Sequence, residues 1–89
     1  MGLLRPVKRE LRLFNVLKAL DEVGEWKSAA EVANVVQRSR QVVYIDLHAL
    51  AGLKLADWRR ISAHSEMLWC VSSAGHEALD DGIVHGLRA

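Results

Sequence analysis

Residues 28–53 read SAAEVANVVQRSRQVVYIDLHALAGL, and their pattern predicts two helices separated by a tight turn. Ser28 and Glu31 have the Ser-x-x-Glu spacing of a capping box, in which each side chain binds a free backbone N–H at the start of a helix. This helix is expected from about Ala29 to Val36. Ser39 is placed to cap a second helix that runs to about Leu50 or Leu53.

The second predicted helix has one apolar and one polar face. Val43, Leu47 and Leu50 follow one another at steps of four and three residues, which places them on the buried side. The opposite side then carries the polar residues Arg40, Gln41, Tyr44 and His48.

A longer helix is predicted before this pair, from about residue 7 to residue 23. Pro6 suits its first turn, where a missing N–H costs nothing, and Gly24 suits its end. Its apolar residues recur at helical spacing and form a broad stripe: Leu13, Val16, Leu17 and Leu20, with Val7, Leu11 and Phe14 beside them. A short extended piece, residues 25–27, follows.

After the helix pair, the pattern becomes strand-like. Residues 56–61 and 67–72 are rich in Trp, Ile, Met and Val, and residues 63–66 are a plausible hairpin tip. Met67, Trp69 and Val71 alternate and are expected to face the core, and Trp26 is expected to pack with Trp69 between sheet and helices. A last helix, capped by Ser72 or Ser73, is predicted over about residues 73–86, with an interruption at Gly82.

The predicted order of elements is that of a winged helix, an α+β fold with a small antiparallel β-wing. Residues 28–33, 39–50 and 71–75 resemble the winged helix-turn-helix regulators, nearest in pattern to the MarR and PadR families. The last stretch, Val-Ser-Ser-Ala-Gly, is similar to the Leu-Thr-x-x-Gly that often closes the wing. The chain departs from the family at Gln37 and Lys54, where members commonly have Gly. The resemblance implies one domain over residues 1–89, with the helix-turn-helix at about 28–53, the wing at about 55–72 and the C-terminal helix at about 73–86.

Size and composition narrow the class of protein. A chain of 89 residues and 9.9 kDa is too short for a two-domain enzyme. Cys70 is the only cysteine and cannot form an internal disulfide. No apolar run approaches the roughly 20 residues that cross a bilayer, and residues 1–6 lack the apolar region of a secretory signal. We therefore expect a cytoplasmic protein.

Charge is distributed in blocks, although the formal net charge is only +1. Residues 38–60 carry five basic side chains against two acidic ones, Asp46 and Asp57. A local basic surface is what binding to a phosphate backbone requires. An ordinary solvated face has the same composition, so charge alone leaves both interpretations open.

Two groups of residues are the predicted DNA-binding site. The first is the recognition helix, with Ser39, Arg40, Gln41, Tyr44 and His48, whose side chains suit base edges and phosphates. The second is the wing, with Arg59, Arg60 and His64, which suit a minor groove or phosphates. The alternatives are a plain polar helix face and cations that protect an edge strand. Asp46 is expected on the flank of the recognition face, where it weakens phosphate binding.

No catalytic or metal-binding pattern is found. The four histidines, at positions 48, 64, 76 and 85, are not spaced with Cys70 as metal ligands. Cys70 is expected to be a structural thiol. The place of Trp58 is left open, because its neighbours on the strand, Asp57 and Arg59, are charged. Neither a phosphate-binding loop nor a catalytic triad occurs. We therefore predict no enzyme, no cofactor, no metal and no small-molecule substrate.

The sequence thus predicts sequence-specific binding of double-stranded DNA, as a small prokaryotic or phage transcriptional regulator. The alternative is a winged helix that binds another protein instead of DNA. One recognition helix reads few base pairs, so a homodimer is expected. The terminal helices offer the surface for it, with Leu11 and Phe14 on the first helix and Leu79, Ile83 and Leu87 on the last.

Overall fold

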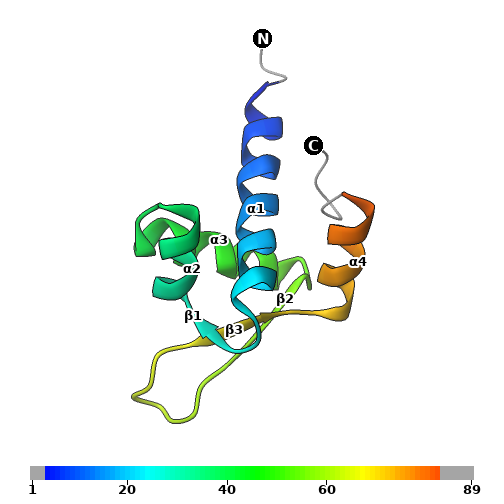
Figure 1. Cartoon of the computed structure of the whole chain (residues 1–89). Helices are drawn as coiled ribbons and strands as arrows, with labels where there is room; N and C mark the ends of the chain where they lie inside the picture. Colours follow the sequence, from blue (N-terminus) through cyan, green and yellow to red (C-terminus); the bar gives the residue numbers. More distant parts are fainter. Residues whose placement is uncertain (1–3, 83–89) are drawn as a thin grey trace.

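Four helices and a three-stranded antiparallel sheet make up the part of the chain that the structure, a computed structural model, describes: residues 4–82. The elements are α1 (Leu4–Val23), β1 (Lys27–Ser28), α2 (Ala29–Val36), α3 (Arg40–Gly52), β2 (Ala56–Arg59), β3 (Leu68–Val71) and α4 (Ser73–Asp81) (Figure 1). The protein is therefore an α+β domain in this region, and the predicted order of elements is confirmed.

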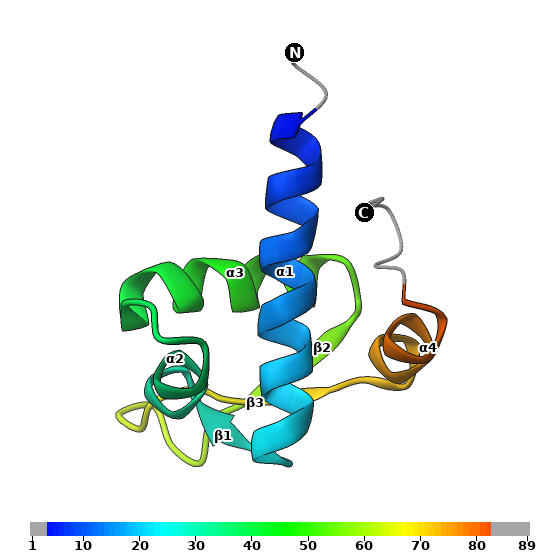
Figure 2. The same ribbon diagram turned by 45° about the horizontal axis from the view of Figure 1, so that its top comes forward.

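Helix α1 is the centre of the molecule. In both views it stands between α2 and α3 on one side and α4 on the other, and its N-terminal half extends beyond the rest (Figure 2). The stripe predicted for it faces inward, since Leu13, Val16, Leu17 and Leu20 have almost no exposed surface. They pack in one core with the buried apolar residues of the other elements, chiefly Val32, Val43, Leu47, Leu50, Leu55 and Trp69. Burial of each such side chain stabilises the fold by about 1.5–3 kcal/mol.

Local capping fixes the starts of α2 and α3. Ser28 Oγ accepts a hydrogen bond from Glu31 N (3.2 Å), and Glu31 Oε1 accepts one from Ser28 N (3.1 Å), which confirms the capping box. Ser39 Oγ accepts a hydrogen bond from Val42 N (3.2 Å) and so caps α3. The predicted bounds of α2 are confirmed. Helix α1 begins at Leu4 instead of residue 7, because Pro6 is tolerated throughout a first turn that needs no N–H bond.

The sheet has the order β1-β3-β2, with all pairs antiparallel. Strand β1 pairs Lys27 with Trp69, and β2 pairs Trp58 with Trp69 from the other side. The predicted strands were too long: β2 ends at Arg59 and β3 covers only residues 68–71. The reason is a turn in the loop between them, where the Ser65 hydroxyl accepts hydrogen bonds from the backbone N–H groups of Ile61 and Ser62.

Ser72 and Gly75 join the sheet to α4. The Ser72 hydroxyl donates a hydrogen bond to Lys54 O (2.7 Å) and accepts one from Gly75 N (3.0 Å), which caps the helix. A Cβ at position 75 would collide with the backbone carbonyl of Leu55. Only glycine allows this close approach, which explains the glycine of the 71–75 motif.

Helix α4 ends at Asp81, and Gly82 follows in a left-handed conformation (φ 71°). The remainder of its predicted range, residues 83–86, lies outside the described residues, as do Ile83 and Leu87. None of the helices within residues 4–82 combines the length and the apolar character that crossing a membrane requires.

Candidate nucleic-acid interface

The outward face of α3 is defined by what the helix buries. Val43, Leu47 and Leu50 have no exposed surface, as predicted, and hold one side of α3 against the core. Ser39, Arg40, Gln41, Tyr44 and His48 are all exposed on the remainder of the helix and its cap. The predicted recognition residues thus share one accessible surface, although the Ser39 hydroxyl is already occupied by the cap.

Tyr44 and His48 are held against the sheet. The Tyr44 hydroxyl donates a hydrogen bond to Met67 Sδ (3.3 Å). The ring of Tyr44 lies edge-on to His48, with 4.4 Å between ring centroids, and His48 lies edge-on to the buried Trp69 at 5.1 Å. These contacts fix the orientation of α3 on β3, and they leave Arg40 and Gln41 as the polar groups that point outward with no such contact.

Ile45 is a residue of this face that the sequence analysis did not select. Its side chain is 60% exposed, four residues after Gln41 and three before His48. The same helical spacing that placed Gln41 and His48 outward also places Ile45 there. It was missed because only polar side chains were considered as contacts to bases.

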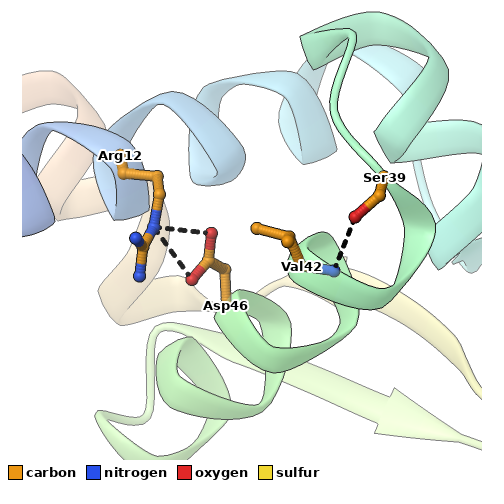
Figure 3. Close-up of polar contacts among 4 residues, drawn as sticks. All are labelled: Arg12, Ser39, Val42 and Asp46. Carbon is orange, nitrogen blue, oxygen red and sulfur yellow. Dashed lines mark hydrogen bonds and ion pairs between the residues drawn. The ribbon is translucent and has the colours of Figure 1, made fainter.

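Asp46 does not lie on the flank of the recognition face, as the sequence analysis expected. It is only 1% exposed and faces α1. Arg12 Nε donates a hydrogen bond to Asp46 Oδ1 (3.2 Å) and lies 3.1 Å from Oδ2 (Figure 3). Asp46 precedes the buried Leu47 and follows Val43 by three residues, so it belongs to the inward side of the helix. Its charge is compensated within the fold and does not oppose a phosphate at the outward face.

A groove of about 520 Å³ separates the N-terminal half of α3 from the end of the β2–β3 loop. Its lining comes from both sides: Arg40, Gln41 and Tyr44 of α3, Glu66, Met67 and Trp69 of the loop and β3, and Ala29 of α2. The groove shows that the loop and the exposed face of α3 are neighbours in space. Glu66 is the one acidic residue of this lining.

The end of β2 and the β2–β3 loop present the predicted wing residues. Arg59, Arg60 and His64 are all exposed. The guanidinium of Arg59 lies 4.1 Å from the ring centroid of Trp26, a cation–π contact. Trp26 is therefore paired with Arg59 at the surface of the sheet, whereas it was predicted to pack with Trp69 in the core. Trp69 is fully buried as predicted, and Trp58 is half-exposed.

Cys70 is partly buried on β3. Burial raises the pKa of its thiol, and the nearby carboxylates Asp57 and Glu25 raise it further. The thiol is therefore protonated at neutral pH, which disfavours nucleophilic or redox chemistry. In the described part of the chain, no three His, Cys, Asp or Glu side chains are placed to hold a metal ion.

No model of a protein family matches the chain, and no curated protein matches its sequence.

Proposed function

We propose that this protein is a winged helix-turn-helix domain that binds double-stranded DNA in a sequence-specific way and regulates transcription in the cytoplasm. In this arrangement α2 and α3 are the helix pair, α3 is the recognition helix, and the β2–β3 loop is the wing. The observation that carries the proposal is the groove lined by Arg40, Gln41 and the end of the loop, because it puts the exposed face of α3 beside the loop that carries Arg60 and His64.

The chemistry of this surface suits a duplex. Arg40 can bind guanine O6 and N7 as a fork, and Gln41 can bind adenine in the same manner. Arg60 and His64 are exposed in the adjacent loop, where they can contact phosphates or a minor groove. In this proposal, α3 reads bases and the loop supplies affinity that is independent of sequence.

A homodimer is part of the proposal, since one recognition helix reads only a few base pairs. Leu11 of α1 is 46% exposed on the side away from the core. Beside it, α1 and α4 form a groove of about 310 Å³, lined by Phe14, Lys18, Asp21, Glu22 and Leu79. A second copy would bury this surface and set two recognition helices about one DNA turn, roughly 34 Å, apart.

The test begins with selection of preferred sequences from a randomised duplex pool, followed by titration of the best duplex at several salt concentrations. Arg40→Ala and Gln41→Ala should each weaken binding to the selected duplex by about 5- to 150-fold, because each loses a base contact of about 1–3 kcal/mol. Lys54→Gly is the control for Arg40→Ala: it also removes one positive charge, but beyond the opposite end of α3.

The wing is tested by the salt dependence. Replacement of Arg60 and Arg59 by Ala should lower the affinity for selected and random duplexes alike. The slope of log K against log salt should fall by roughly one unit for each lost phosphate contact. An unchanged slope would show that these arginines do not touch DNA.

Docking to another protein is the second candidate function. It is favoured by Glu66 in the groove and by the exposed apolar side chain of Ile61 in the β2–β3 loop. A protein that enriches no sequence from the pool and binds random duplex no better than a neutral protein would refute the DNA proposal and leave this candidate.

A further inference from the structure

Ile45 is an exposed apolar side chain at the border of the polar face of α3, where Gln41 lies on one side of it and Val42 on the other. It is 60% exposed and belongs to no part of the hydrophobic core. Large apolar residues on α3 otherwise face inward or lie at its edge, as Val42 does at 38% exposure. Ile45 therefore contributes little to the stability of the isolated fold, and its side chain is accessible to a partner of α3.

The residues one helical turn from Ile45 on α3 include no Lys, Arg, Asp or Glu. Gln41 lies one turn before it and His48 one turn after it, and the acidic side chain next to it, Asp46, is turned inward and paired with Arg12 (Figure 3). A partner surface at Ile45 is therefore expected to be apolar and narrow, with hydrogen-bonding groups on either side.

The major groove of DNA offers such a surface at each thymine. The 5-methyl group is the apolar group that the groove exposes, and apolar side chains recognise it. One helical turn of α3 rises 5.4 Å. Ile45 thus reaches the base pair next to, or one beyond, the pair that Gln41 contacts.

We infer that Ile45 is a specificity-determining residue, which recognises a thymine through its 5-methyl group. This inference rests on the proposed DNA binding by α3. The inference predicts that each half-site contains a thymine close to the position read by Gln41. Base contacts by Arg40 and Gln41 alone would not require this thymine.

The test uses uracil, which is thymine without the 5-methyl group and keeps the same base pairing. In the selected duplex, each thymine is replaced in turn by deoxyuridine, and the affinity of the wild-type protein is measured. One replacement per half-site should weaken binding by about three- to tenfold, as expected for the loss of one buried methyl contact.

The same duplexes are then titrated with variants. Ile45→Ala and Ile45→Gln should bind the thymine and uracil duplexes equally well, because the partner of the methyl group is gone. Val42→Ala is the matched control, a truncated apolar residue at the edge of α3, and it should keep the wild-type sensitivity to uracil. A thermal melt of each variant shows that the fold is retained.

The inference is overturned if no single uracil weakens wild-type binding, if the selected half-site contains no thymine, or if Ile45→Ala keeps the full sensitivity. In each of these cases the duplex is still bound, so the proposed function stands. Absence of any preferred duplex overturns both proposals, and the selection from the randomised pool identifies that case before the variants are made.

Discussion

Lys54 holds a left-handed backbone conformation, with φ of 67°, directly after the end of α3. Gln37 does the same between α2 and α3, with φ of 56°. These are the two positions at which the family that the chain resembles commonly has Gly. A left-handed conformation costs a residue with a Cβ roughly 1–2 kcal/mol, so both turns keep their shape at a cost to stability.

Lys54→Gly should therefore raise the free energy of unfolding by about 0.5–1 kcal/mol, the relieved strain less the entropy that glycine gains in the unfolded chain. Urea denaturation measures this change in the free energy of unfolding. Ala30→Gly is the control: an exchange to glycine at an exposed position within α2, where the backbone is helical, should lower stability by about 0.5–1 kcal/mol. A loss of the same size in both variants would contradict the strain argument.

Ionisation of Glu31 makes the stability of the cap at the start of α2 depend on pH. The hydrogen bond from the Ser28 backbone N–H, with smaller help from the Ser28 hydroxyl and Lys27, lowers the pKa of this carboxyl group. A lowered pKa in the folded state means that the ionised group stabilises the fold above its ordinary pKa of about 4.3. That contribution is lost as the pH falls through the lower, folded-state value.

Comparison with Glu31→Gln tests this, because glutamine keeps the shape and the accepting oxygen but has no charge. Wild type should be more stable than Glu31→Gln at pH 7, and the difference should shrink toward pH 3. Urea denaturation of both proteins across this range gives the result. A difference that stays constant with pH would show that the charge of Glu31 has no role in the cap.

At the scale of elements, α1 and α3 are joined by a polar contact inside an otherwise apolar interface. Arg12 and Asp46 are 34 residues apart in the chain, and Asp46 is almost completely buried. A carboxylate at such a site requires a compensating charge, because removal from water is costly. The pair therefore fixes how α3 lies on α1.

Arg12→Ala should lower the free energy of unfolding by about 2–4 kcal/mol, since it leaves the buried Asp46 unpaired. This expected loss is smaller than for a fully buried ion pair, because the Arg12 side chain is 37% exposed. The double variant Arg12→Leu with Asp46→Leu should be close to wild type in stability, because apolar side chains replace the pair without leaving a charge. If the double variant is less stable than Arg12→Ala, the pair contributes more than compensation of charge.

At the scale of the whole molecule, α1 projects beyond the other elements (Figure 2). This projecting helix and the groove that it forms with α4 suit a second copy of the chain. Light scattering of the wild type at micromolar concentration should give about twice the chain mass of 9.9 kDa. Leu11→Glu should give the monomer, because it places a charge in the apolar contact. Ile61→Glu is the control: it makes the same kind of change in the β2–β3 loop and should leave the mass at the dimer value. A wild type with the mass of one chain would refute the dimer.

The sequence by itself determined the features that depend on neighbours in the chain. The capping box of Ser28 and Glu31 set the start of α2, the cap of Ser39 set the start of α3, and periodic apolar residues set the buried faces. Each rests on groups at most four residues apart, so the pattern of residue types carries the information. The exposed positions of Arg40, Gln41 and His48 follow from the same periodicity.

The tertiary structure decided the features that depend on distant residues. Strand β1 is only two residues long and shows no periodicity, and it becomes a strand by pairing with β3. The Tyr44 hydroxyl is taken by Met67, 23 residues away, and Asp46 is buried because Arg12, 34 residues away, compensates its charge. Such contacts form only when the core brings α1, α3 and β3 together, because the energy of each depends on a partner that local spacing does not identify.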